Sequence, residues 1–156
     1  MALEIDIAVE AGDWPPEDVL ALASERACAA AFSELGIEPN GTELSLVFTN
    51  DASIRELNRE WRGKDKATNV LSFPAFEVAP GDALPPMLGD VILGYETVSR
   101  EAALDAKPFK HHLAHLLVHG LLHLLGYDHE NDADADEMEG LERKILQRLS
   151  VPDPYV

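Results

Sequence analysis

One stretch, Leu113 to Leu125, contains no charged residue and constrains the fold of this chain more than any other feature. Leucine, valine and alanine fill nearly every position there that is not His or Gly, so we expect a helix buried on most of its sides. His119 and His123 would lie one turn apart on one face of that helix. Buried imidazoles need partners, because an unpaired buried polar group costs about 1–3 kcal/mol.

The spacing of these two histidines with His129 indicates a metal site. Gly126 can adopt a positive φ and turn the chain, which would bring His129 back toward the other two. Three neutral imidazoles with an open fourth position are the ligands of a catalytic zinc ion. We therefore predict one Zn²⁺ per chain, held by His119, His123 and His129. Core histidines that bond to backbone carbonyls are the simpler alternative, but with His115 the stretch has too many imidazoles for packing to explain easily.

The same spacing matches the zinc-protease signature H-E-x-x-H-x-x-G-x-x-H at every position but one. Gly120 stands where that signature has the glutamate that acts as general base. The metal site is therefore protease-like, whereas the chemistry is expected to differ. A zinc metallopeptidase without the usual base remains an alternative.

Three blocks of sequence follow one another in a recognisable order and spacing. They run from Leu57 to Pro74, from Leu88 to Val91 and from His115 to His129. Together they resemble the YbeY family of bacterial endoribonucleases, also called rRNA maturation factors, and the resemblance covers nearly the whole chain. One departure is Ala67, where the family usually has proline before the threonine. This difference should loosen the loop slightly without touching the chemistry.

The resemblance implies hydrolysis of single-stranded RNA in ribosomal RNA maturation, at the 3′ end of the small-subunit rRNA, and in ribosome quality control. His119 and Arg62 would be the catalytic residues. Zinc on three neutral histidines lowers the pKa of bound water to about 7, so that hydroxide, or a polarised ribose 2′-OH, attacks phosphorus. Arg62 would bind the phosphoryl oxygens bidentately as negative charge develops. A structural salt bridge at the end of a helix is the alternative role for Arg62.

The charge of the chain argues against a general nucleic-acid binder. There are 12 Lys and Arg against 29 Asp and Glu, a formal net charge of −17, whereas phosphate backbones are bound by Lys and Arg. Five of the basic residues nevertheless lie close together: Arg55, Arg59, Arg62, Lys64 and Lys66. The resemblance to the YbeY family favours a phosphate-facing patch here, so Arg59, Lys64 and Lys66 are expected to bind the substrate. A solvated helix face with Glu56 and Glu60 as ion-pair partners is the alternative.

An acidic protein would bind RNA weakly by itself, so we expect a partner to present the substrate. Small-subunit ribosomal proteins or a ribosome assembly GTPase are the expected partners, and DNA is not expected. No apolar run approaches the length of a membrane span, and the first residues lack the features of a signal peptide. Cys28 stands alone, which excludes an internal disulfide. These observations favour a cytoplasmic protein without a membrane partner. A non-enzymatic ribosome assembly factor with a structural zinc is the principal rival.

Hydrophobic periodicity predicts a single α+β domain over residues 1–156, with a small four-stranded mixed sheet packed against about five helices. Strands are expected at residues 3–9, 43–49, 69–73 and 89–94. Helices are expected after Pro16, after Asn50 or Asp51, from Tyr95, from Pro108 and at 133–149, with a loop at 77–87. Ile54, Leu57 and Trp61 should face inward, as should Met138, Leu141, Ile145 and Leu149. His111 and His112 are expected at the surface or cleft rim, and Asp128 beside a metal-bound histidine.

Overall fold

The chain folds as the α+β domain that the sequence predicts, in a computed structural model that describes residues 1–156. The four strands form one mixed sheet in the order β1-β2-β4-β3, in which only β3 runs antiparallel to its neighbour. The strands are β1 (Glu4–Val9), β2 (Glu43–Thr49), β3 (Val70–Pro74) and β4 (Met87–Gly94). The helices are α1 (Glu17–Leu35), α2 (Asp51–Arg62), α3 (Tyr95–Leu104), α4 (Phe109–Leu124) and α5 (Asp132–Arg148).

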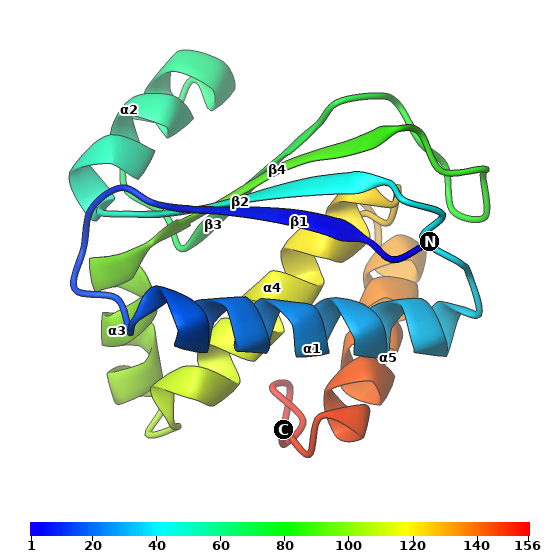
Figure 1. Cartoon of the computed structure of the whole chain (residues 1–156). Coiled ribbons are helices and arrows are strands. Elements are labelled where there is room, and N and C mark those ends of the chain that lie inside the picture. The colour runs from blue at the N-terminus through cyan, green and yellow to red at the C-terminus, as the bar shows by residue number, and fades with distance from the viewer.

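The helices are divided unequally between the two faces of the sheet. Figure 1 shows α1, α3, α4 and α5 together on one face and α2 alone on the other. The helical face covers a core of 24 buried residues, to which α4 contributes Leu116, Leu117 and Leu121 among others. The α2 face covers a cluster of only three buried residues, Ile54, Leu71 and Ile92. Helix α4 therefore lies in the interior, as its uncharged sequence predicts, while α2 is a surface helix.

Helix α2 begins and ends as expected, but the prediction that all three of its large apolar residues face inward is wrong for one of them. The Asn50 side chain accepts a hydrogen bond from the Ser53 N–H, and Gly63 ends the helix in the left-handed conformation. Trp61, expected to face inward with Ile54, is 65% exposed. The helix rises from the sheet toward its C-terminal end (Figure 1), so its last turn lies beyond the small cluster that buries Ile54.

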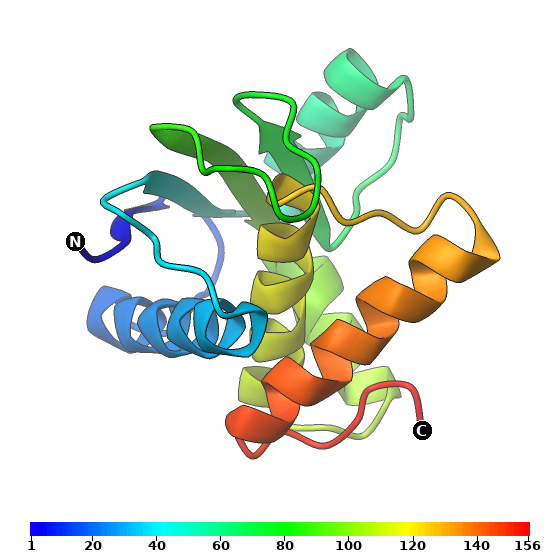
Figure 2. The ribbon, with the colours of Figure 1, turned by 90° about the vertical axis from the view of Figure 1, so that its right-hand side faces the viewer.

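Helix α5 follows its predicted pattern closely. Asn131 caps it by accepting a hydrogen bond from the Asp134 N–H, and Asp132 and Asp134 lie in the first turn, where negative charge is favourable. Met138 and Ile145 are buried, and Leu141 and Leu149 pack against the core. The helix lies across α4 (Figure 2), so a side chain on its inner face can reach the histidines.

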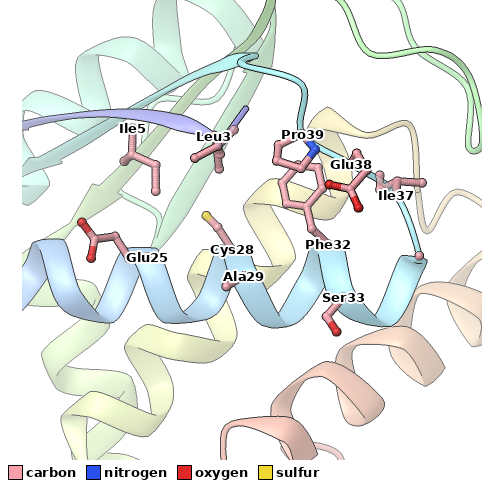
Figure 3. Close-up of a pocket in the computed structure, with 12 residues that line it drawn as sticks. Leu3, Ile5, Glu25, Cys28, Ala29, Phe32, Ser33, Ile37, Glu38 and Pro39 are labelled. Atoms are coloured by element: carbon pink, nitrogen blue, oxygen red, sulfur yellow. The ribbon is translucent and has the colours of Figure 1, made fainter.

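A hollow of about 710 Å³ lies between the edge strand β1 and helix α1, away from the histidines. Figure 3 shows Leu3 and Ile5 of the strand facing Cys28 and Phe32 of the helix across it. No histidine, lysine or arginine lines this hollow. It therefore offers neither the imidazoles nor the basic side chains of the predicted site. None of the helices has the length and apolar character needed to cross a membrane.

Candidate functional site

The three predicted ligand histidines come together at the C-terminal end of α4. His119 and His123 point from the last turns of the helix, and His129 lies in the segment that leads to α5. Each of the three can offer a ring nitrogen within 4.8 Å of the others. The Nε2 atoms of His119 and His123 are 3.1 Å apart. Two nitrogens bound tetrahedrally to one zinc ion would be about 3.3 Å apart, so the pair is already close to ligand spacing.

Gly126 makes the turn that returns His129 to the cluster. Its φ of 101° is a conformation that residues with a side chain rarely adopt. A Cβ at this position would also collide with the backbone of Val78 and Ala79 in the β3–β4 loop. Figure 2 shows this loop passing over the C-terminal end of α4. Glycine is therefore required here for two independent reasons: the positive φ of the turn toward His129 and the close passage of the β3–β4 loop.

Gly120 is the position at which a zinc protease would have its glutamate. A Cβ there would lie 2.7 Å from Cγ1 of Val91 and 3.3 Å from Oγ of Ser72, because α4 packs directly onto the sheet. The Ser72 hydroxyl also donates a hydrogen bond of 3.1 Å to the Gly120 carbonyl. A larger side chain at this position would require Val91 and Ser72 to move. The packing of α4 onto the sheet therefore favours glycine where the protease signature has its glutamate.

A buried carboxylate that the sequence analysis missed supports the cluster from behind. Glu142 of α5 is completely buried, and its Oε1 lies 3.1 Å from Nδ1 of His119. The same oxygen lies 2.9 Å from Nε2 of His115. Asp128, the predicted partner, instead accepts a hydrogen bond of 2.7 Å from the backbone N–H of His129. The sequence did contain a signal for Glu142, because it is a glutamate within the otherwise apolar inner face of α5.

The electrostatics of the site favour a neutral His123 ring near a charged Glu142 carboxylate. Burial, together with the nearby His119 and His129, lowers the pKa of His123 to about 4, so its ring is neutral at neutral pH. Burial alone would raise the pKa of Glu142, but hydrogen bonds from His115 and His119 lower it to about 2. Neutral imidazoles have the lone pairs that a metal ion requires.

These residues fit the predicted zinc ion. Three imidazoles with lone pairs converge, a carboxylate holds the far nitrogen of one of them, and one side of the group opens into a cleft. This is the arrangement of protein ligands with an outer carboxylate that zinc sites commonly have. A second group of three donors, His115, His119 and Glu142, also lies within 4.8 Å, but its atoms are already hydrogen-bonded to one another.

One cleft of about 820 Å³ is lined both by the three histidines and by basic residues at the end of α2 and just after it. Arg62, Lys64 and Lys66 contribute to one part of the lining, and His119, His123 and His129 to another. The β3–β4 loop adds Phe76, Glu77 and Val78. Arg59, the fourth basic residue predicted to bind substrate or transition state, is exposed but does not line the cleft. The structure thus joins two sequence blocks that lie far apart in the chain.

Arg62 contacts uncharged groups, a backbone carbonyl and an aromatic ring. Its Nη2 donates a hydrogen bond of 2.6 Å to the Ser72 carbonyl, and its guanidinium carbon lies 5.3 Å from the centre of the Phe73 ring. The ion pair in this region belongs to Arg55, whose Nε lies 2.8 Å from Asp65. The structure thus contains no salt bridge of the kind considered for Arg62, nor ion pairs from Glu56 or Glu60. The guanidinium keeps donors free for a ligand.

The position of His112 corrects a further expectation. It was expected at the surface or rim, but it is only 6% exposed, and its Nε2 lies 2.8 Å from Glu101 of α3. His111, at the start of the same helix, is partly exposed. His112 is therefore a core histidine with a carboxylate partner, outside the group that faces the cleft.

Comparisons with known proteins agree with this geometry. The profile of the family described as Endoribonuclease YbeY matches residues 10–150. The chain belongs to the Endoribonuclease YbeY family. The Endoribonuclease YbeY of Rhizobium meliloti (strain 1021) is 60% identical over 160 residues, which cover 99% of this chain and 95% of that protein. The Endoribonuclease YbeY of Sinorhizobium fredii (strain NBRC 101917 / NGR234) is 58% identical, and the match covers 99% of this chain and 92% of that protein. The resemblance drawn from the sequence is thereby confirmed, together with the enzyme class.

A solved structure shares the fold of this YbeY-family chain. The solution structure of TM1509 from Thermotoga maritima has a TM-score of 0.62 and 26% sequence identity. The similarity covers 92% of this chain and 89% of that one. The α+β architecture is therefore an arrangement shared with an experimentally determined protein.

Proposed function

We propose that this protein is a metal-dependent endoribonuclease that cuts single-stranded RNA during the maturation of ribosomal RNA. The observation that carries the proposal is the shared cleft: three convergent imidazoles and three basic side chains without acidic partners line one cavity. Metal ligands and phosphate-binding groups in one cleft suit a phosphodiester substrate. Membership of a family of endoribonucleases supports the same reaction.

The cofactor in this proposal is one Zn²⁺ per chain, held by His119, His123 and His129. Zinc bound there would supply a Lewis acid and a lowered pKa for the water that it holds. The protein supplies the rest. Glu142 accepts from Nδ1 of His119, which directs the Nε2 lone pair toward the cluster. The neutral ring of His123 needs no deprotonation to bind the ion.

Arg62 supplies positive charge for the reacting phosphate, and we propose it as a catalytic residue with His119. Its contacts with Ser72 and Phe73 orient the guanidinium, while no carboxylate neutralises it. A planar guanidinium binds two phosphoryl oxygens at once and gains strength as their charge grows. Lys64 and Lys66 extend the basic lining and would bind neighbouring phosphates. Arg59 would assist from outside the cleft, where its charge still attracts the RNA.

The acidic remainder of the chain restricts which RNA is cut. A formal net charge of −17 weakens the attraction of the protein as a whole for RNA, so the basic residues of the cleft become the main attraction for the strand. We propose that small-subunit ribosomal proteins or an assembly GTPase present the RNA strand in the cytoplasm. The substrate would be the 3′ end of the small-subunit rRNA, with a further role in ribosome quality control.

A panel of matched substrates tests the proposed specificity. The purified, metal-loaded protein is incubated with a single-stranded RNA, the same RNA paired with its complement, a DNA of the same sequence and an unfolded peptide. We expect cleavage of the single-stranded RNA alone. Zinc-dependent cleavage of the peptide would support the peptidase alternative, and absence of RNA cleavage with full zinc content would support the assembly-factor alternative.

A further inference from the structure

Three side chains, from helix α4 and the C-terminal segment, meet around one buried carboxylate of α5. Glu142 of α5 is completely buried and accepts hydrogen bonds from His115 and His119 of α4. The third donor is Tyr155, which directly precedes the last described residue and whose hydroxyl lies 2.9 and 2.8 Å from the two carboxylate oxygens. The donors to this carboxylate are therefore two histidines and a tyrosine, and none is a lysine or an arginine.

The chemistry of the acceptor determines the tautomer of His119. An ionised carboxylate can only accept, so the nitrogen that faces it must have the proton. Nδ1 of His119 faces Glu142 at 3.1 Å, so Nε2 is the nitrogen that has the lone pair in the neutral ring. That Nε2 faces Nε2 of His123 in the metal cluster. The hydrogen bond therefore fixes both the plane of the ring and the nitrogen that offers a lone pair.

The other two donors hold the carboxylate in place. His115 shares Oε1 of Glu142 with His119, Tyr155 contacts both carboxylate oxygens, and the contact between His115 and Tyr155 is 3.3 Å. Tyr155 is in turn packed under the guanidinium of Arg143, which lies 5.2 Å from its ring centre. Glu142 thus has little freedom to rotate away from His119. Its negative charge, which no lysine or arginine neutralises, also favours a cation at the neighbouring cluster.

We propose that Glu142 is a positioning residue for the metal cluster, and that Tyr155 and His115 hold its carboxylate against His119. This inference rests on the proposed metal-binding role of His119. The C-terminal segment of the chain thereby takes part in the active centre, although it lies outside the cleft. The competing role for these residues is a second ion held by His115, His119 and Glu142, since their donor atoms also lie within 4.8 Å of one another.

The test compares Glu142→Gln with Asp136→Asn, which removes one negative charge from an exposed position on the same helix. Zn²⁺ affinity is measured by competition with a chelator, and the tautomer of His119 in the metal-free protein by nitrogen NMR. We expect Glu142→Gln to bind Zn²⁺ about 10–100-fold more weakly and to lose the single Nδ1–H tautomer. Asp136→Asn should match the wild type in both. Unchanged affinity and tautomer in a folded Glu142→Gln protein would overturn the proposal.

Tyr155→Phe provides a second, milder variant that leaves His119 and Glu142 intact. We expect a smaller loss of Zn²⁺ affinity than in Glu142→Gln, because one of three donors to the carboxylate is removed while the contact with His119 remains. Wild-type affinity in Tyr155→Phe would remove the C-terminal segment from the account. Binding of two zinc ions per wild-type chain, reduced to one by Glu142→Gln, would overturn the proposal in favour of the second-ion role.

These readouts separate this proposal from the proposed function. Neither Zn²⁺ affinity nor the tautomer of His119 requires RNA. If the wild-type protein binds Zn²⁺ but cuts no RNA, the proposed function fails while the role of Glu142 stands. If the wild-type protein cuts RNA and Glu142→Gln keeps full Zn²⁺ affinity, the role of Glu142 fails while the proposed function stands.

Discussion

The two faces of the sheet hold their proposed functional residues in opposite ways. On the α4 face, the histidines project from a helix embedded in a core of 24 buried residues, and a completely buried carboxylate holds one of the rings. On the α2 face, Arg62 projects from an exposed helix that covers three buried residues and is held by one carbonyl and one ring. Metal ligands must keep a fixed geometry, whereas phosphate-binding groups must remain accessible to a flexible strand. The unequal packing provides both.

The largest effect should follow from loss of a histidine on the buried face. His119→Ala removes both a proposed ligand and the partner of Glu142, so zinc and RNA cleavage should be lost. The loss of cleavage should exceed about 100-fold, which is the upper end of the losses seen when a hydrogen-bond partner of a metal ligand is removed. Elemental analysis and a cleavage assay measure the two effects. His111→Ala, on the same helix but outside the cluster, should retain both, and metal with full activity in His119→Ala would contradict the account.

Arg62→Ala tests the exposed face and should have the next largest effect. Loss of a donor to the developing phosphoryl charge should reduce cleavage by about 10²-fold or more. Arg62→Lys should restore little, because an ammonium lacks the bidentate geometry. Zinc content should not change, and the free energy of unfolding should change by only ~0–1 kcal/mol, as for other exposed charged groups.

Arg55→Ala is the matched control on the same helix. It removes the ion pair with Asp65 but leaves the cleft lining intact, so cleavage should be retained. The comparison breaks down if Arg62→Ala loses stability while cleavage per folded molecule stays at the wild-type level. That pattern would make Arg62 a structural residue.

Gly120→Ala probes the close packing of α4 onto the sheet. The added Cβ would lie 2.7 Å from Val91, so we expect a destabilisation of about 1–3 kcal/mol, as in other overpacked cores. Gly140→Ala is the control, because its Cβ would have no neighbour within 4 Å. Its helix should become more stable, by about 0.5–1 kcal/mol. Chemical denaturation measures both changes, and equal effects of the two substitutions would disprove the packing argument.

The smallest effects should come from the two lysines of the cleft. Lys64→Ala and Lys66→Ala should each weaken RNA binding severalfold and reduce its salt dependence by about one phosphate contact. Arg59→Ala should have a weaker effect, since Arg59 does not line the cleft. Binding measured over a range of salt concentrations gives the slopes. If none of the three substitutions changes the salt dependence of binding, Arg59, Lys64 and Lys66 do not bind phosphates, and Arg62 is the only basic residue left in the proposal.

The difference between the faces also explains which residues could be predicted from the sequence. His119, His123, Gly126 and His129 lie within one short segment, so the periodicity of a helix and one turn suffice to bring them together. The elements were predicted to within a few residues for the same reason, because alternation and helix ends are local signals. Local patterns of this kind are strongest in the buried part of the molecule.

The residues that prediction missed depend on contacts between distant elements. Glu142 meets His119 only because α5 crosses α4, and His112 is buried because Glu101 of α3 lies beside it. Trp61 continues the apolar stripe of α2, but a helical period does not reveal how far the sheet extends beneath the helix. Arg62 and the histidines likewise line one cleft only because distant elements pack together. The sequence could suggest this only through the family resemblance.

Removal and return of the metal tests the central claim most directly. The protein is treated with a chelator, freed of it and then supplied with Zn²⁺, while single-stranded RNA cleavage and thermal unfolding are followed. The account predicts that the metal-free protein cuts no RNA yet still unfolds in one cooperative transition, because the apolar core is independent of the ion, and that Zn²⁺ restores cleavage. Undiminished cleavage without metal, or a metal-free chain that is already unfolded, would contradict it.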